Sequence, residues 1–124
     1  MNPIQSLAEN DSRSPHWRTG SFIDVLHEQH EWDVNEYWKL ESALYAVAPN
    51  ARRRADASAF RTFSYIMLTF SCHFDPSDGY SIRNLSTDDI YAYRERAQLV
   101  FEGYFANELP EKDAFELVNP LLPS

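Results

Sequence analysis

The longest hydrophobic pattern in the chain lies between residues 56 and 74. Its aromatic and methionine side chains recur every three or four positions, at Phe60, Phe63, Met67, Phe70 and Phe74. This spacing lines them along one side of an α-helix. Further apolar residues fall on its other sides, at Tyr65, Ile66, Leu68 and Cys72. Because a helix that is apolar around most of its circumference is typically buried, the pattern predicts a buried central helix over about residues 54–74.

A strand is the alternative for part of this segment. Residues 69–74 alternate roughly between apolar and polar, and Asp78-Gly79 would supply a turn toward Tyr80 and Ile82. The aromatic stripe persists over fifteen positions, however, which is longer than an ordinary strand. We therefore favour the helix.

Two further helices are predicted before this segment. Ser21 followed by Asp24 resembles a capping box and starts a helix that ends near His30. Asp33, with Glu36 three residues later, starts the next helix, which Pro49-Asn50 ends. The side chains expected to face inward on these two helices are Phe22, Ile23, Leu26, Tyr37, Leu40, Leu44 and Val47.

A long helix is predicted after the central one. Ser86 and Asp89 form another pair typical of a helix start, and residues 107–110 break the pattern. The expected inward row is Ile90, Tyr93, Ala97, Val100 and Tyr104. Residues 111–118 could add a short helix.

The remaining segments are connections. Residues 1–13 lack a hydrophobic period, which predicts a loose N-terminal tail or one that docks on the body. Residues 75–79 have turn composition, and residues 80–85 form either a linker or one short extended segment. Taken together, residues 1–124 are expected to form a single all-α domain, a compact bundle of four to five helices around the buried central helix.

Charge and cysteine content narrow the class of protein. The chain has 19 acids and 11 bases, a formal charge of −8, which repels nucleic acids and anionic membranes and favours a basic partner. Solubility alone would also explain this excess of acids. Cys72 is the only cysteine, no apolar run is long enough to span a bilayer, and no secretory signal starts the chain. We therefore expect a cytoplasmic, soluble protein that binds neither nucleic acid nor membrane directly.

Candidate catalytic and metal-binding residues are few. His27 and His30 are three apart, with Asp24 and Glu31 nearby, and residues at this spacing on a helix could hold a metal. No second Glu-x-x-His accompanies them, so a solvated histidine pair is the simpler interpretation. Cys72 beside His73 does not make a dyad, because adjacent helical residues point about 100° apart. We therefore expect no enzyme and no cofactor, with a small metal-binding enzyme on His27 and His30 as the alternative.

The only basic cluster is Arg52, Arg53 and Arg54. Three arginines in an acidic chain, without aromatic residues between them, do not predict a nucleic-acid site. A loop position, or pairing with nearby acids, is the simpler interpretation.

Acids and aromatic residues gather in two segments that could bind a basic protein through anchors and steering charge. The first segment is the loop that leads into the last helix, together with the start of that helix. Its candidate residues are Asp75, Asp78, Tyr80, Asp88, Asp89 and Tyr91. The second is the corner between the first two helices, with Glu28, Glu31, Glu36 and Trp32 as a possible aromatic anchor. Capping and solubility would explain each acid taken singly.

Two segments resemble a known family. GSFIDVLHEQHEWDVNEYWKLESAL (residues 20–44) and NLSTDDIYAYRER (residues 84–96) are similar to small helical immunity proteins of bacterial contact-dependent growth-inhibition and related polymorphic toxin systems. The resemblance implies a cytosolic, non-enzymatic antitoxin that binds one-to-one to the C-terminal toxin domain of a cognate protein, often a basic nuclease. The matching positions are mostly capping and core residues, so they inform the fold and carry over no binding residue: Ser21, Phe22, Trp38, Leu40 and Leu44.

Two other classes stay open from the sequence. An acidic mimic of nucleic acid would inhibit many unrelated basic proteins, whereas an immunity protein discriminates its cognate toxin. A structural subunit of a larger assembly would expose an apolar patch and self-associate.

Overall fold

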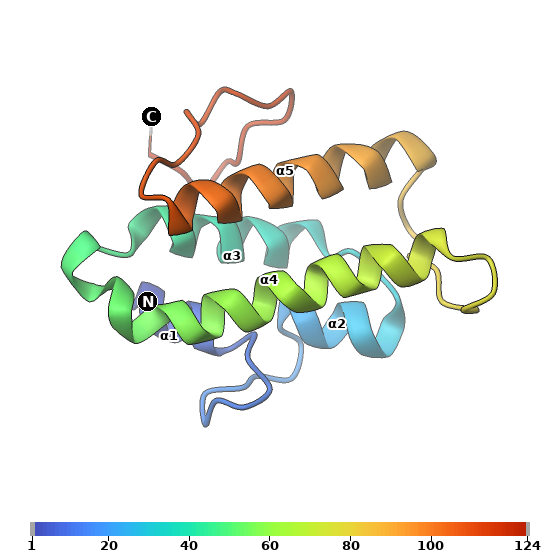
Figure 1. The fold of residues 1–124 in the computed structure, drawn as a ribbon, viewed down its shortest axis with the longest axis horizontal. Coiled ribbons are helices and arrows are strands. Elements are labelled where there is room, and N and C mark those ends of the chain that lie inside the picture. The colour runs from blue at the N-terminus through green and yellow to red at the C-terminus, as the bar shows by residue number, and fades with distance from the viewer. Residues whose placement is uncertain (1, 124) are drawn as a thin grey trace.

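The computed structural model describes residues 2–123 and is all-helical within that range (Figure 1). Its elements are α1 (Pro3–Ala8), α2 (Phe22–Gln29), α3 (Val34–Ala46), a short 3-10 helix η1 (Pro49–Ala51), α4 (Arg52–Phe74) and α5 (Thr87–Phe105). The two longest helices, α4 and α5, run antiparallel beside each other, with α3 packed behind them and α1 against both α3 and α4. The prediction of an all-α bundle is confirmed.

Local capping explains where three of the helices begin. The Ser21 hydroxyl accepts a hydrogen bond from the Asp24 N–H (3.3 Å), and the Ser86 hydroxyl accepts one from the Asp89 N–H (3.2 Å). The Asp33 carboxylate does the same for the Glu36 N–H (3.1 Å). Each such cap stabilises a helix by about 1 kcal/mol. All three starts agree with the sequence prediction.

The inward rows predicted for α2, α3 and α5 are also confirmed. These side chains belong to the buried core, namely Phe22, Ile23, Leu26, Tyr37, Leu40, Leu44, Val47, Ile90, Tyr93, Ala97, Val100 and Tyr104. They form one hydrophobic cluster together with residues of α1 and α4.

The face that α4 turns inward differs from the prediction. Its fully buried face consists mainly of small and hydroxyl side chains, namely Ala55, Ala59, Thr62, Ile66, Thr69 and Phe70. Of the predicted stripe only Phe70 is fully buried, whereas Phe60 is 54% exposed. The helix itself is correct, but the prediction that it is buried on most of its circumference is wrong.

Close approach between helices explains this difference. Alanine lets the backbone of α4 lie near α1 and α5, and the two threonine hydroxyls donate to carbonyls four residues earlier, at Ser58 (2.8 Å) and Tyr65 (2.9 Å). A threonine satisfied in this way is compatible with a buried helix face. The hydrophobic spacing alone therefore predicted the side of α4 next to the one that is buried.

The N-terminal segment is a packed part of the bundle. Asn2 caps α1 through its side chain, Pro3 occupies the first helical position, and Leu7 is fully buried. Asp11 is held by Arg61 and Ser58 of α4, at 2.6 Å and 2.7 Å. The prediction of a loose tail is wrong, because this segment supplies the core residue Leu7 and the buried carboxylate of Asp11, which the hydrophobic period did not indicate.

A buried polar network fastens the segment after α5. Glu41 of α3 receives two hydrogen bonds from Arg96 of α5, at 2.7 Å and 2.9 Å, and one from Asn119 at 3.1 Å. Arg96 also donates to the Leu117 carbonyl. Residues 111–118 form turns and bends instead of the short helix that the sequence suggested, and they place the Leu117 carbonyl and the Phe115 ring against the Arg96 guanidinium.

The linker of residues 80–85 contains no strand and ties two corners of the bundle together. The Arg83 N–H donates to the His30 carbonyl (2.8 Å). The Asn84 side chain accepts from the Trp32 N–H (2.8 Å) and donates to the Trp32 carbonyl (2.9 Å). The loop between α4 and α5 is thereby held against the loop between α2 and α3.

Candidate partner-binding surfaces

The two acid-rich segments predicted from the sequence meet at one end of the bundle. At the right-hand end of Figure 1, α2 and α4 finish while α3 and α5 begin. Residues 80–85 join the α2–α3 corner to the start of α5 at this place. We call this region the acidic end and define it by its exposed or half-exposed carboxylates: Glu28, Glu31, Asp75, Asp78, Asp88 and Asp89.

The loop after α4 is shaped by its own carboxylates. Asp75 accepts hydrogen bonds from the Ser77 N–H (2.9 Å) and hydroxyl (2.7 Å), and these bonds lower the pKa of the Asp75 carboxyl. Asp78 accepts from the Tyr80 N–H (3.3 Å), and Gly79 adopts a φ of 84° that favours glycine. The loop is therefore a defined turn that presents the carboxylates of Asp75 and Asp78 to solvent.

The other acids of this end carry less internal structure. Asp88 and Asp89 are exposed in the first turn of α5, where negative charge complements the helix dipole. Glu28 is exposed on α2, and Glu31 lies 3.5 Å from the guanidinium of Arg83. These four side chains are accessible to a partner.

The prediction that Trp32 is a surface anchor is wrong. It is fully buried, and its ring lies 4.7 Å from that of Phe22, 4.9 Å from Tyr93 and 5.4 Å from Phe70. The indole fills the space where α2, α3, α4 and α5 converge. Its place in a loop between two helices gave no indication of this burial.

Tyr80 and Tyr91, the other two predicted aromatic contacts, differ from each other in exposure. Tyr80 is half-buried, its hydroxyl donates to the Leu26 carbonyl (2.7 Å), and burial raises the pKa of that hydroxyl well above its usual range. Tyr80 is thus mainly a structural residue of the linker. Tyr91 is 49% exposed on α5 and remains available for contact.

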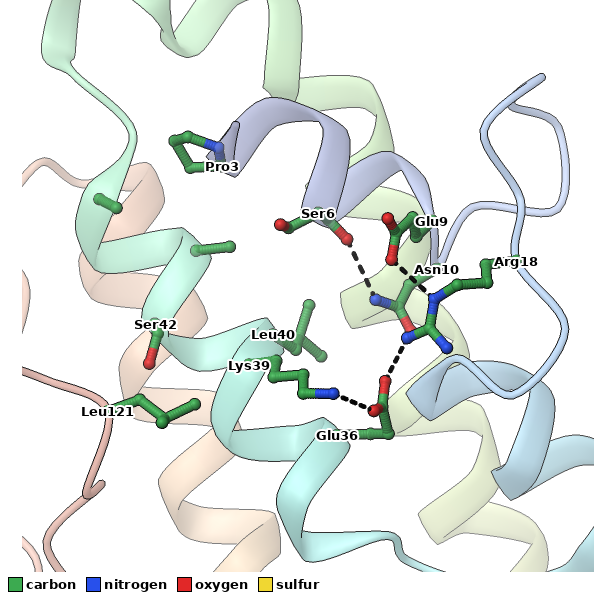
Figure 2. Close-up of a pocket in the computed structure, with 12 residues that line it drawn as sticks. Pro3, Ser6, Glu9, Asn10, Arg18, Glu36, Lys39, Leu40, Ser42 and Leu121 are labelled. Atoms are coloured by element: carbon green, nitrogen blue, oxygen red, sulfur yellow. Dashed lines mark hydrogen bonds and ion pairs between the residues drawn. The ribbon is translucent and has the colours of Figure 1, made fainter. Parts of the chain in front are cut away.

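Glu36 is engaged inside the protein (Figure 2). A groove of about 620 Å³ lies between α1 and α3, and its charged side chains are paired with one another. Arg18 contacts both Glu9 (2.8 Å) and Glu36, and Lys39 donates to Glu36 at 2.7 Å. Burial opposes the ionisation of Glu36, but the bonds from Lys39 and Arg18 outweigh it and lower the pKa of its carboxyl. Glu36 therefore ties the segment before α2 to α3, and it is not free for a partner.

His27 and His30 do not share a helix face. His27 lies on α2 with its Nδ1 atom 2.6 Å from the Tyr65 hydroxyl. His30 leaves the helix in the left-handed conformation (φ 57°), and its ring centroid lies 4.4 Å from that of Tyr80, with the two rings tilted. Within residues 2–123, no three His, Cys, Asp or Glu side chains are grouped so as to hold a metal ion.

A second feature beside the acidic end was missed by the sequence analysis. A hollow of about 600 Å³ opens between α4 and α5, and Phe74, Asp75, Tyr91 and Arg94 contribute to its lining. The Arg94 guanidinium lies 5.1 Å from the ring centroids of both Phe74 and Tyr91. The helical spacing predicts Phe74 as a core residue. Neither helix taken alone indicates that Phe74 of α4 pairs with Tyr91 of α5.

Comparisons with known proteins found no match that bears on these surfaces. No family model matches the chain, no curated protein matches it, and no solved structure matches it. Among the described helices, none combines the length and apolar character needed to cross a membrane.

Proposed function

We propose that this protein is a cytoplasmic immunity protein, which binds and neutralises the C-terminal toxin domain of a cognate contact-dependent growth-inhibition protein. In this proposal the toxin domain is a basic protein, with a nuclease as the favoured case. The complex contains one toxin domain per chain. The observation that supports the proposal is the acidic end, where two acid-rich segments that are distant in the sequence lie at the same end of the bundle.

The charge of this end suits such a partner. A nuclease must present a basic groove to the phosphate backbone, and exposed carboxylates attract that groove from a distance and speed the encounter. The chain as a whole carries a formal charge of −8, which adds to the same steering field. Nucleic acid itself would be repelled by both.

The acidic end is also held in shape before any partner arrives. Asn84 clamps the Trp32 backbone on both sides, and Asp75 and Asp78 close the turn after α4. A surface that is ordered in the free protein loses less conformational entropy on binding. An inhibitor that must capture a toxin quickly benefits from both the steering charge and the ordered loop.

The first test is rescue and binding. The C-terminal domain encoded by the reading frame beside this one is expressed in a sensitive bacterium, with and without this chain, and the two purified proteins are mixed in a calorimeter. We expect growth to be rescued and a one-to-one complex with a Kd of about 1–10 nM, within the range of specific protein pairs. Absence of both toxicity and binding would refute the immunity proposal.

The second test concerns the surface. In one variant Glu28, Glu31, Asp88 and Asp89 are all replaced by Lys; in a matched control Glu108, Glu111, Asp113 and Glu116, which are exposed in the segment after α5, are replaced by Lys. Both variants change the net charge equally. We expect the first to slow association at least about tenfold at low salt, since steering charges act mainly on the association rate, and the control to have a much smaller effect. If both variants bind alike at low and high salt, the acidic end is not the contact surface.

A further inference from the structure

The outward side of α4 and α5 carries two parallel rows of large side chains. On α4, Phe60, Met67 and Phe74 are seven residues apart, and on α5, Tyr91, Gln98 and Phe105 have the same spacing. Residues seven apart lie on one line along a helix, as in the contact line of a coiled coil. The aromatic members of these rows are exposed: Phe60 54%, Phe74 37%, Tyr91 49% and Phe105 43%. We call this surface the α4–α5 face.

The two rows are aligned so that aromatic residues pair at both ends. The rings of Phe60 and Phe105 lie 6.4 Å apart at one end, and those of Phe74 and Tyr91 lie 5.2 Å apart at the other. Met67 and Gln98 mark the middle of their rows. Since a helix rises 1.5 Å per residue, the two aromatic pairs are about 21 Å apart and equidistant from the centre. A surface with like features on both sides of its centre can match a copy of itself through a two-fold axis.

Two charged residues of α5 follow the same symmetry with opposite signs. Arg94 and Glu102 are both exposed on α5 and stand four residues before and four residues after Gln98. On α4 the exposed charges do not follow this symmetry, because Arg53 lies fourteen residues before Met67 and Asp75 lies eight residues after it. Neither Arg53 nor Arg94 has a carboxylate within ion-pair distance in the part of the chain that the structure describes. Along α5, one end of the face therefore offers the charge that the other end lacks.

We propose that the α4–α5 face binds a second copy of this chain, through a two-fold axis that crosses both helices at Met67 and Gln98. Each helix then packs antiparallel on its own counterpart. The Phe60–Phe105 pair of one chain meets the Phe74–Tyr91 pair of the other, and Arg94 approaches Glu102. A two-fold axis along the helices would instead place α4 on α5, so that Arg94 would approach Asp75 of the other chain. Exchanging the charges of Arg94 and Glu102 between two chains distinguishes the two axes, because only the crossing axis makes these two residues partners.

The described part of the chain supplies no other cover for this face. The segment after α5 is engaged on the opposite side of that helix, where Asn119 donates to the Trp38 carbonyl (3.0 Å) and the Tyr45 hydroxyl donates to the Pro110 carbonyl (2.7 Å). The formal charge of −8 opposes self-association, so the dimer forms by mass action at high protein concentration. Tyr91 and Asp75 belong to this face as well as to the first predicted surface, so a paired chain offers a toxin mainly the other carboxylates of the acidic end.

The first experiment measures the mass of the full chain by sedimentation equilibrium, from about 1 μM to about 1 mM, a range that spans weak and moderate dissociation constants. We expect a reversible monomer–dimer equilibrium. Phe60→Ser is expected to weaken it about 100-fold, because the two-fold axis removes two aromatic contacts of about tenfold each. The control is Leu68→Ser, since Leu68 is equally exposed on α4 (57%) but lines a different hollow with His27 and Tyr65. A monomer throughout the range, larger aggregates, or equal loss in both variants would overturn the proposal.

The second experiment exchanges charges between chains. In Arg94→Glu alone and in Glu102→Arg alone, both symmetric contacts become repulsive, and each variant is expected to be at least about tenfold weaker in self-association than the natural chain. In an equal mixture of the two variants every such contact is attractive again, so a mixed dimer is expected to form. Salt is a poor probe here, because it screens the local attraction and the repulsion between two acidic chains together.

The Glu102→Arg variant separates contact from net charge. It makes the chain less negative, so a dimer limited only by overall repulsion would become tighter, whereas the proposed contact becomes weaker. Circular dichroism checks that both exposed substitutions leave the helices intact. Failure of the mixed dimer to form would overturn the antiparallel arrangement. None of these outcomes depends on a toxin, so they test the dimer separately from the proposed function.

Discussion

Arg94 and Arg96 stand two residues apart on α5, and each places its guanidinium against two aromatic rings. Arg96 lies 4.6 Å from the ring centroids of Trp38 and Phe115, and Arg94 lies 5.1 Å from those of Phe74 and Tyr91. Yet Arg96 is 4% exposed, while Arg94 faces solvent. The same local chemistry thus serves a buried site on one side of the helix and an open surface on the other.

The difference comes from what the rest of the chain supplies. On the Arg96 side, α3 contributes Glu41, and the segment after α5 folds back with Phe115 and Asn119. On the Arg94 side, residues 2–123 contribute no carboxylate partner and no covering segment. Stacking an arginine between aromatic rings therefore does not by itself distinguish a structural residue from a contact residue. The decisive features are a matching carboxylate and a segment that excludes water.

The largest expected effect comes from breaking the buried pair. Glu41→Ala leaves the Arg96 guanidinium buried without its carboxylate, and the free energy of unfolding is expected to fall by about 3–5 kcal/mol. Urea denaturation followed by circular dichroism measures this loss. The joint replacement Glu41→Leu with Arg96→Met is expected to recover most of it, since no charge then remains buried. A loss below about 1 kcal/mol in Glu41→Ala would mean that the network contributes little to stability.

The Asp11–Arg61 pair, in which only the carboxylate is buried, is expected to have an intermediate effect on stability. Burial disfavours the ionised form of Asp11, but hydrogen bonds from Arg61, Ser58 and the Arg13 N–H outweigh it and lower the pKa of the carboxyl from 3.8 to about 2. Because the folded-state pKa lies below the unfolded one, this group stabilises the fold above pH 3.8, and the stabilisation is lost as the pH falls toward 2.

The size and test of this effect follow from the exposure of Arg61, whose side chain is 40% accessible. Allowing for solvent screening, we expect the pair to contribute about 1–2 kcal/mol at neutral pH. Unfolding is compared at pH 7 and near pH 2.5 in the natural chain and in Asp11→Asn, which does not titrate. The pH-dependent loss should be smaller in the variant; equal losses would rule out Asp11 as a source of the acid sensitivity.

The smallest effect is expected on the open side. Arg94→Met removes an exposed cation from two aromatic rings, and the free energy of unfolding of the monomer should change by no more than about 0.5–1 kcal/mol. Arg96→Met, measured in parallel at low protein concentration, should cost several times more because it leaves Glu41 buried without its counter-charge. Similar losses in the two variants would remove the contrast between the two sides of α5.

Much of the helical framework could be read from short stretches of sequence. The starts of α2, α3 and α5 follow from the caps at Ser21, Asp33 and Ser86, because a cap bonds to an N–H only three residues away. The inward rows of these helices follow from their three-to-four spacing, since one helix alone determines which side chains share a face. Both kinds of information are local.

The errors lie where one segment meets another. The pattern of α4 marks two adjacent sides as apolar, and only its neighbours decide that Ala59 and Thr62 face the core while Phe60 faces outward. Trp32 lies in a loop by sequence, yet it is buried because four helices converge on it. Glu36 is a helix-start acid by sequence, and Arg18, eighteen positions earlier, removes it from the surface.

The sequence by itself determined the helices, their caps, the inward rows of α2, α3 and α5 and the excess of acids. Only the tertiary structure decided which acids share the acidic end, which carboxylate Arg96 receives, and that aromatic side chains from α4 and α5 form one exposed face. The physical reason is range: a cap or a helical stripe depends on residues within a few positions, whereas packing, burial and charge pairing depend on segments that folding brings together from up to 81 positions apart.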